Sequence, residues 1–252
     1  MSTPAVTASG RYGRPRVALL ATLVLVALPS AAAPIAAAAP TAPAATAAVP
    51  VHARQAIVVL LRAHEARSLP RVRSAPLGLV PATTPITAGH TVLPVLARRG
   101  RWLKVRLPGR PNSHTGWINV AATVRSNTVW HLVVNRSRRQ VTAYKSGRPV
   151  RVFAAIVGKA STPTPAGEFY VEESVALRAG DAGAPFALAL SARSNVFQEF
   201  DGGPGQIALH GLTNVGGVLG TAVSHGCVRL ADDTMRWLVL RIGPGVPVTI
   251  AG

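Results

Sequence analysis

Apolar residues recur in short runs divided by turn formers, a pattern that predicts a chain built mainly of β-strands. In the front half the predicted strands are Thr91–Leu96, Arg101–Leu107 and Thr115–Val120. Within the second of them Leu103, Val105 and Leu107 alternate with arginine and lysine, so one face is expected to be buried and the other basic. The apolar run Ile57–Leu61 fits either a short helix or a buried strand, because its length does not separate the two.

The second half of the chain predicts another sheet with one helix near its end. Its predicted strands are Thr128–Asn135, Gln140–Lys145, Val150–Val157, Phe169–Val171 and Val246–Ile250. The turn formers Ser146-Gly147 predict a hairpin between the second and third of these. Apolar residues at helical spacing, between two first-turn acids and Gly243-Pro244, predict a helix over Ala231–Ile242. Residues 178–205 are rich in glycine, alanine and proline and predict a loop over the sheet.

The N-terminal segment has the layout of a secretory signal peptide. Three arginines precede the uncharged apolar run Val17–Pro29, and Ala-x-Ala sites follow it. We therefore expect a signal peptide over residues 1–39, a linker over residues 40–50, and export. The apolar run is shorter than the roughly 20 residues that cross a bilayer, so a membrane is an expected partner only if the signal stays uncleaved.

Charge is distributed unevenly along the chain. The formal net charge is +18. Residues 1–125 hold 15 basic residues and one acidic residue, whereas residues 126–252 hold 12 and eight. In an exported protein this basic front half points to anionic cell-envelope polymers as partners rather than to nucleic acid. A compositional bias toward arginine and alanine is the alternative explanation.

The chemistry concentrates around the only cysteine, Cys227. A single cysteine excludes an intrachain disulfide and a cysteine-rich zinc module. A thiol becomes a strong nucleophile when it loses its proton, and His210 and His225 both lie within 17 positions of Cys227. Gly226 frees the adjacent backbone, whose N–H groups can then face an oxyanion. The alternative is an inert buried thiol with two ordinary histidines, but the compact Ser-His-Gly-Cys sequence favours catalysis.

Two segments resemble known families. His210, followed after 13 residues by Ser224-His225-Gly226-Cys227-Val228-Arg229, and Thr164-Pro165-Ala166-Gly167 upstream, resemble the signature of L,D-transpeptidases with a YkuD-type catalytic domain. The spacer is slightly short, and Arg229 stands where many members have Asn. This resemblance implies a β-sandwich-like catalytic domain over residues 126–252, with one helix after the Cys motif. Residues 51–124, ending near Gly116-Trp117-Ile118, resemble a bacterial SH3-like β module.

The L,D-transpeptidase resemblance also implies a role for each residue of the motif. Cys227 is expected to be the nucleophile and His210 the base or ion-pair partner that activates it. His225 is expected to shape the oxyanion pocket and orient the substrate. The Gly211 carbonyl is expected to hold the tautomer of His210.

The remaining motif residues are assigned to the oxyanion and the substrate. The N–H groups of Gly226 and Cys227, next to Ser224, are the expected oxyanion donors. If residues 227–229 are extended, Arg229 points to the same side as Cys227 and can bind a substrate carboxylate. A salt bridge between Arg229 and Asp232 or Asp233 is an equal alternative.

The function implied is an exported enzyme of the cell wall or a periplasm-like space. It would acylate its thiol with a peptidoglycan stem peptide and form 3→3 cross-links without a cofactor or metal. Alternatives are an L,D-carboxypeptidase that uses the same site, a sortase-like transpeptidase, and a non-catalytic wall-binding protein. The absence of Ser-x-x-Lys, His-Glu-x-x-His, Gly-x-Ser-x-Gly and a P-loop argues against penicillin-type enzymes, zincins, serine esterases and nucleotide hydrolases.

Overall fold

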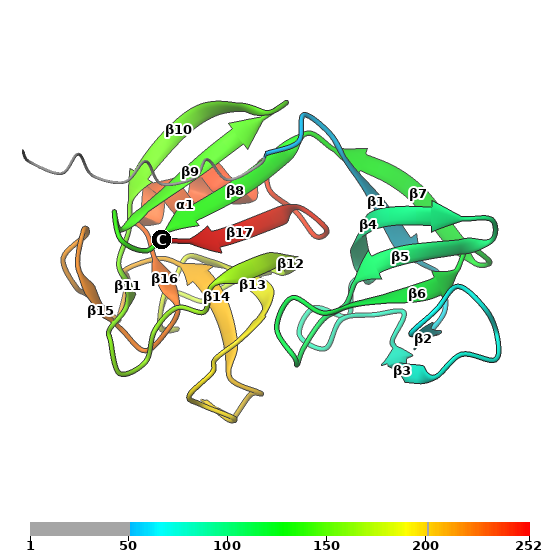
Figure 1. Cartoon of the computed structure of the whole chain (residues 1–252). Coiled ribbons are helices and arrows are strands. Elements are labelled where there is room, and N and C mark those ends of the chain that lie inside the picture. Colours follow the sequence, from blue (N-terminus) through cyan, green and yellow to red (C-terminus); the bar gives the residue numbers. More distant parts are fainter. Residues whose placement is uncertain (1–50, 201) are drawn as a thin grey trace, which may run out of the picture. The chain divides into compact units, whose positions relative to one another are not determined.

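A computed structural model describes residues 51–200 and 202–252, all of which fall in one unit of the chain. The signal peptide predicted for residues 1–39 and the linker predicted for residues 40–50 lie outside the described residues. The described part forms seventeen strands and one helix, so the fold is mainly β, as the sequence predicts (Figure 1). Within the same ranges, no helix has the length and apolar character needed to cross a membrane.

The front of the chain forms a seven-stranded sheet, here called the first sheet. Its strand order is β3-β2-β6-β5-β4-β1-β7. The strands are β1 Gln55–Leu60, β2 His64–Arg67, β3 Pro76–Val80, β4 Val92–Arg99, β5 Trp102–Arg106, β6 Thr115–Asn119 and β7 Thr123–Thr128. The ambiguous run Ile57–Leu61 is thus mostly a strand, with β4 paired on one side and β7 on the other. In β5, Leu103 and Val105 are buried while their neighbours are not, which confirms the predicted alternation.

The first sheet extends further along the chain than the module predicted for residues 51–124. Strand β7 pairs with β1 over its whole length, from Gln55↔Thr128 to Leu60↔Thr123. The predicted start of the second domain at residue 126 therefore falls inside a strand of the first sheet. The next sheet begins at Trp130. The resemblance of the front segment to an SH3-like domain stays a prediction.

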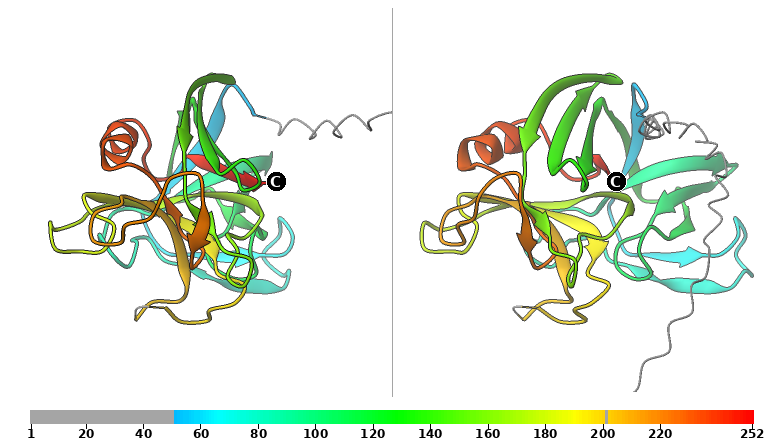
Figure 2. Two further views of the ribbon diagram at one scale, coloured as in Figure 1. Left: turned by 90° about the vertical axis from the view of Figure 1, so that its left-hand side faces the viewer. Right: turned by 60° about the vertical axis from the view of Figure 1, so that its left-hand side comes forward.

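The rest of the chain forms an eight-stranded sheet, here called the second sheet, in the order β10-β9-β8-β17-β12-β13-β14-β16. The strands are β8 Trp130–Asn135, β9 Gln140–Lys145, β10 Arg148–Ala154, β12 Gly167–Ala176, β13 Phe186–Arg193, β14 Gln206–His210, β16 Val228–Arg229 and β17 Pro247–Ala251. Strands β11 Val157–Gly158 and β15 Ala222–Ser224 pair separately. Helix α1, Asp232–Val239, packs against β13 and β14 (Figure 2). The predicted hairpin, with Ser146 and Gly147 at positive φ, and the single helix are confirmed.

Both halves of the second sheet contribute to one hydrophobic core. Leu132 and Val141 enter it from one half, and Leu188 and Leu209 from the other. The register of β12 shifts between Val171 and Glu173, where the strand changes its pairing from β17 to β13. The two halves of the sheet therefore enclose a shared core, as the β-sandwich-like domain implied by the resemblance requires.

The loop predicted for residues 178–205 is wrong in its middle. Residues Phe186–Arg193 form β13, a strand of the second sheet that pairs with β12 and β14. This strand is rich in alanine and lacks β-branched residues, so its composition does not indicate a strand. Its stability comes from burial between two neighbouring strands rather than from residue preference, since Leu188, Leu190 and Ala192 are fully buried.

Candidate active site

The pairing of β14 with β16 places the predicted cysteine and histidine on one face of the sheet. Leu209 lies opposite Val228, and both side chains are fully buried in the core. Because successive side chains of a strand point to opposite faces, His210 and Cys227 turn away from that core. The parallel register makes these two residues diagonal neighbours on the same face.

This face opens into a cavity of about 400 Å³. Its lining includes Cys227, His210, His225, Ser224 and Arg229, so the structure brings together five of the seven site residues predicted from sequence. The other two, Gly211 and Gly226, lie directly beside them in the chain. The rest of the lining comes largely from the segment between β13 and β14 and from the start of β14: Ser194, Phe197, Phe200 and Gly205 from the segment, Gln206 and Ile207 from β14, with Ala182 and Val215.

The imidazole of His210 has a defined tautomer. Its Nδ1 lies 2.9 Å from the Gly211 carbonyl oxygen, as the resemblance implies. Because a carbonyl oxygen only accepts, Nδ1 carries the proton and Nε2 is left as an acceptor. Burial lowers the pKa of His210 from its ordinary value, and the charge of Arg229 acts in the same direction while the Gly211 contact opposes it. The ring is therefore neutral at neutral pH and able to take a proton.

The thiol of Cys227 is also neutral at neutral pH. The residue is half-buried, and loss of solvent raises the pKa of the thiol. A hydrogen bond with the backbone of Ala208 and the charge of Arg229 lower that pKa but do not outweigh burial. The sequence left open whether His210 is a base or an ion-pair partner. Burial of both side chains favours their uncharged forms, the state in which His210 would act as a base.

Ser224 fixes the backbone of the Ser-His-Gly-Cys turn. Its hydroxyl donates to the Cys227 carbonyl at 2.6 Å and accepts from the Gly226 N–H at 3.2 Å. Gly226 has φ +124°, a conformation that side chains other than hydrogen rarely allow. The Gly226 N–H, expected to be an oxyanion donor, is therefore occupied by Ser224. Within the described residues the Cys227 N–H has no hydrogen-bond partner.

The Thr-Pro-x-Gly element holds the same turn through hydrogen bonds to its backbone. Thr164 Oγ1 donates to the Gly226 carbonyl at 2.8 Å and accepts from the Gly158 N–H at 2.9 Å. Thr162 Oγ1 donates to the Ser224 carbonyl at 3.2 Å. Both threonines are buried. The sequence identified Thr164 as part of a motif but gave no reason for it; the structure makes it a support of the cysteine turn.

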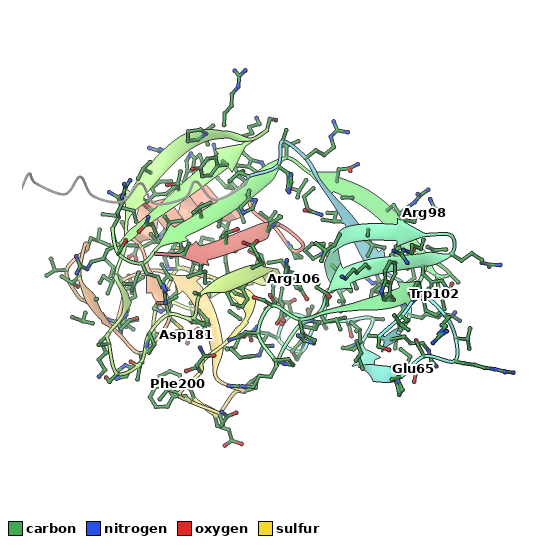
Figure 3. The ribbon with its side chains drawn as sticks, viewed as in Figure 1. Glu65, Arg98, Trp102, Arg106, Asp181 and Phe200 are labelled. Atoms are coloured by element: carbon green, nitrogen blue, oxygen red, sulfur yellow. The ribbon has the colours of Figure 1, made fainter. Side chains whose placement is uncertain are left out.

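His225 lies at the rim of the cavity rather than beneath the thiol. It is exposed, and its Nε2 lies 3.5 Å from Lys159 Nζ. The rings of Phe197 and Phe200 each lie 6.2 Å from the imidazole, centroid to centroid. Figure 3 shows Phe200 projecting from its loop. Sequence analysis missed these two phenylalanines because they lie in the Gly- and Ala-rich segment and match no motif.

Arg229 belongs to the cavity and not to an ion pair with the helix. Its Nη1 donates to the carbonyls of Val215 and Gly216, each at 3.2 Å. Asp232 instead accepts hydrogen bonds from the loop after β14, and Asp233 lies 3.9 Å from an arginine within α1. The salt-bridge alternative is therefore wrong, and a charged guanidinium remains at the cavity wall.

Two glycines allow the backbone to close tightly around His210. A Cβ on Gly183, at φ +82°, would overlap Nδ1 of the His210 ring. A Cβ on Gly211 would overlap the Ala184 carbonyl and would lie 2.5 Å from Asp232 Oδ1. The role of Gly183 has no sequence signal, because this glycine is distant from the motif along the chain.

Comparison with known proteins points to one family. Residues 130–250 match the model of the YkuD family, the L,D-transpeptidase catalytic domain. The candidate L,D-transpeptidase YkuD of Bacillus subtilis is 27% identical over 147 residues, which cover 57% of this chain and 72% of that protein. L,D-transpeptidase 1 of Mycobacterium tuberculosis is 27% identical over 132 residues, 48% of this chain and 49% of that protein. The chain thus spans about half the length of the second relative.

Solved structures give weaker matches. An L,D-transpeptidase from Mycobacterium smegmatis aligns with a TM-score of 0.39 at 20% identity and covers 65% of this chain and 91% of that chain. L,D-transpeptidase 3 from Mycobacterium tuberculosis, in complex with a faropenem-derived adduct, aligns with a TM-score of 0.40 at 15% identity and covers 63% and 97%. The family model and the sequence relatives support a YkuD-type L,D-transpeptidase catalytic domain over residues 130–250.

Proposed function

We propose that the chain is an exported L,D-transpeptidase that forms 3→3 cross-links in peptidoglycan through an acyl-enzyme on Cys227. The observation that carries this proposal is the shared face of β14 and β16, which aims Cys227 and His210 into one cavity. The match of residues 130–250 to the L,D-transpeptidase catalytic domain supplies the substrate class, a peptidoglycan stem peptide.

In the first half of the reaction Cys227 is acylated. As its sulfur bonds to the carbonyl carbon of the L-centre of a tetrapeptide stem, the thiol proton moves to Nε2 of His210. The electron pair of the carbonyl moves to its oxygen and then returns, which breaks the bond to the terminal D-residue. The departing amine takes the proton from His210. The products are a thioester on Cys227 and a free D-amino acid.

In the second half a side-chain amine of another stem attacks the thioester. His210 takes a proton from this amine as the new amide bond forms, and the sulfur leaves as a thiolate that takes the proton back. The thiol is restored and a 3→3 cross-link results. With water in place of the amine, the same steps give an L,D-carboxypeptidase.

The hydrogen bonds and contacts of the groups around Cys227 suggest what each of them does in the reaction. The Cys227 N–H is the proposed oxyanion donor, because the neighbouring Gly226 N–H is occupied by Ser224. Arg229 keeps a positive charge at the cavity wall and is proposed to bind a substrate carboxylate. His225 and its phenylalanine neighbours are proposed to orient the stem peptide at the rim.

Intact-mass spectrometry tests the proposal directly. Incubation with a soluble tetrapeptide stem should add the mass of the tripeptide acyl group to the wild-type protein and not to Cys227→Ala. His210→Ala should acylate about 10²- to 10⁴-fold more slowly, the usual loss of a general base. His225→Ala should slow acylation less, and His90→Ala, an exposed histidine between β3 and β4, is the matched control. A folded wild-type protein that forms no adduct, or an adduct that persists in Cys227→Ala, contradicts the proposal.

A further inference from the structure

The loop between β13 and β14, described at residues 194–200 and 202–205, forms one wall of the active-site cavity. Its base is closed by a hydrogen bond of 2.7 Å from the Ser194 N–H to the Gly205 carbonyl. Phe197 and Phe200 stand on the loop with ring centroids 5.5 Å apart and flank His225. The placement of this loop therefore decides the shape of the cavity above Cys227.

A residue from the first sheet's half of the chain holds this loop. Arg110 follows β5, and its Nη1 donates to the Pro204 carbonyl at 2.9 Å. Its Nη2 donates to the Ser194 carbonyl at 2.8 Å and to the Phe197 carbonyl at 2.9 Å. One guanidinium thus binds both ends of the loop and the residue that carries a cavity ring. The planar guanidinium of arginine suits this geometry, because its several N–H groups can donate to three carbonyl oxygens at once.

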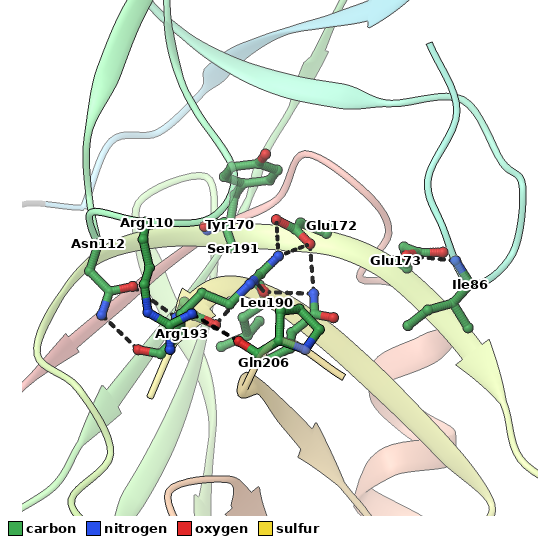
Figure 4. A network of polar contacts seen from close by, with 12 residues as sticks. Ile86, Arg110, Asn112, Tyr170, Glu172, Glu173, Leu190, Ser191, Arg193 and Gln206 are labelled. Carbon is green, nitrogen blue, oxygen red and sulfur yellow. Dashed lines mark hydrogen bonds and ion pairs between the residues drawn. The ribbon is translucent and has the colours of Figure 1, made fainter. Parts of the chain in front are cut away.

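Asn112 reinforces the contact two residues later. It bonds both backbone groups of Arg193, accepting from the N–H at 2.8 Å and donating to the carbonyl at 2.7 Å. The Arg193 side chain pairs with buried Glu172 at 3.2 Å, and Glu172 accepts from Gln206 at 2.6 Å (Figure 4). Gln206 itself lines the cavity. The loop is therefore held where it leaves β13 and where it enters β14.

We propose that Arg110 is a positioning residue of the active site, which fixes the described parts of this loop, residues 194–200 and 202–205, so that Phe197 and Phe200 form the wall for the donor stem peptide. This inference rests on the proposed function. It assigns the front segment a part in substrate binding and not only a role in attachment to the cell wall. A purely structural role would hold the two sheets together without affecting how the peptide binds.

The test compares Arg110→Ala with Arg101→Ala in the full-length protein. Arg101 is also an exposed arginine of the front segment, and within the described residues its side chain makes no hydrogen bond. Acylation by the tetrapeptide stem is measured as kcat and KM, and alkylation by iodoacetamide reports the Cys227 thiol alone. Hydrogen exchange of the amides of residues 195–200, 202 and 203 reports the loop and needs no substrate.

Arg110→Ala should lower kcat/KM by roughly ten- to a hundredfold, mainly through KM, because a misplaced contact surface weakens substrate binding. Alkylation should stay unchanged, and exchange in the loop should rise. Arg110→Lys should recover little, because one ammonium keeps the charge but loses the fork. Arg101→Ala should behave as wild type in all three measurements.

Two results overturn the proposal. The first is loop exchange that stays at the wild-type level in Arg110→Ala, which would mean that the arginine does not fix the loop. The second is faster exchange with unchanged kcat and KM, which would mean that the fixed loop does not position the peptide. If the wild-type protein forms no thioester, the proposed function fails, and the exchange measurement still decides whether Arg110 holds the loop.

Discussion

Thr164 and Gly226 lie 62 positions apart, yet the threonine hydroxyl donates a 2.8 Å hydrogen bond to the glycine carbonyl. The same hydroxyl accepts from the Gly158 N–H, so one buried side chain satisfies two backbone groups. One of those groups belongs to the residue before Cys227. The threonine upstream and the Ser-His-Gly-Cys turn are therefore parts of one structure, which explains why both occur together in the motif.

Replacement of Thr164 by valine should destabilise the fold and slow acylation. Valine keeps the shape but leaves the Gly226 carbonyl and the Gly158 N–H without a partner. An unsatisfied buried polar group costs about 1–3 kcal/mol. Chemical denaturation measures the free energy of unfolding, and intact-mass kinetics measure acylation.

Thr142→Val is the matched control, because Thr142 makes no side-chain hydrogen bond within the described residues. It should change the free energy of unfolding by less than about 0.5 kcal/mol. If Thr164→Val is as stable and as active as this control, the support that we assign to Thr164 does not exist.

The thiol of Cys227 should carry its proton at neutral pH. Burial raises its pKa from 9.0, and burial lowers the pKa of His210 from 6.5. The ultraviolet absorbance of a thiolate, taken as wild type minus Cys227→Ala, should therefore be absent at neutral pH and appear only above pH 9.0. The acid limb of kcat/KM should lie below pH 6.5, because protonation of His210 removes the base.

A standing thiolate–imidazolium pair gives the opposite result. The thiolate absorbance would then persist through neutral pH and would disappear in His210→Ala, which removes the cation that stabilises it. The two arrangements share one pH–rate profile, so the absorbance decides between them.

The sequence could indicate which residues lie together at the cavity because the motif is local. His210 ends a strand and Cys227 precedes one; their types and spacing indicate a thiol near two histidines, and the family resemblance implies their roles. The Gly211 carbonyl beside Nδ1 could be foreseen because it belongs to the next residue. What could not be foreseen are contacts between residues far apart in the chain. Neither Arg110 nor Gly183 carries a motif, and only the fold brings them to the cavity.

For the fold, too, local patterns were predictable from sequence, and features that depend on distant neighbours were not. Strands β5 and β8 were predicted near their observed bounds, because the alternation of the half-buried β5 and the continuous apolar run of the buried β8 are both visible in sequence. Strand β13 was missed because its burial depends on neighbours that sequence does not reveal. The Gly226 N–H was assigned to the oxyanion because sequence does not show which acceptor, here Ser224, reaches it first.

Acid should destabilise the protein through His131. This histidine is buried, and its Nε2 lies 2.8 Å from the Thr249 hydroxyl. Burial, with a smaller contribution from the charge of His52, lowers its pKa from 6.5 to about 4. The unfolded chain therefore binds a proton first as pH falls. Stability should be full above pH 6.5 and decline toward pH 4, by about 3 kcal/mol at most for a shift of this size.

Denaturant unfolding at a series of pH values measures this decline. His131→Gln keeps a hydrogen-bonding group but does not titrate, so its stability should vary less between pH 6.5 and 4 than that of the wild type. His90→Ala, an exposed histidine, should leave the slope unchanged. An equal slope in His131→Gln and wild type would show that other groups cause the acid sensitivity.

Tyr170 lies on β12 of the second sheet, but its ring packs into the core of the first sheet with Leu103 and Ile118. It is 1% exposed, and its hydroxyl has no hydrogen-bond partner within the described residues. Burial raises the pKa of this hydroxyl well above its ordinary value. The ring therefore stabilises the junction of the sheets, whereas the hydroxyl is buried at a cost.

Tyr170→Phe should consequently be as stable as the wild type or more stable by up to about 1 kcal/mol, since it removes a buried polar group that has no partner. Tyr170→Ala should lose about 3–5 kcal/mol, because it leaves a cavity where the sheets meet. Chemical denaturation of both variants measures these differences. A loss above about 1 kcal/mol in Tyr170→Phe would mean that the hydroxyl has a partner such as a buried water. A small loss in Tyr170→Ala would mean that the two sheets do not depend on this ring for their stability.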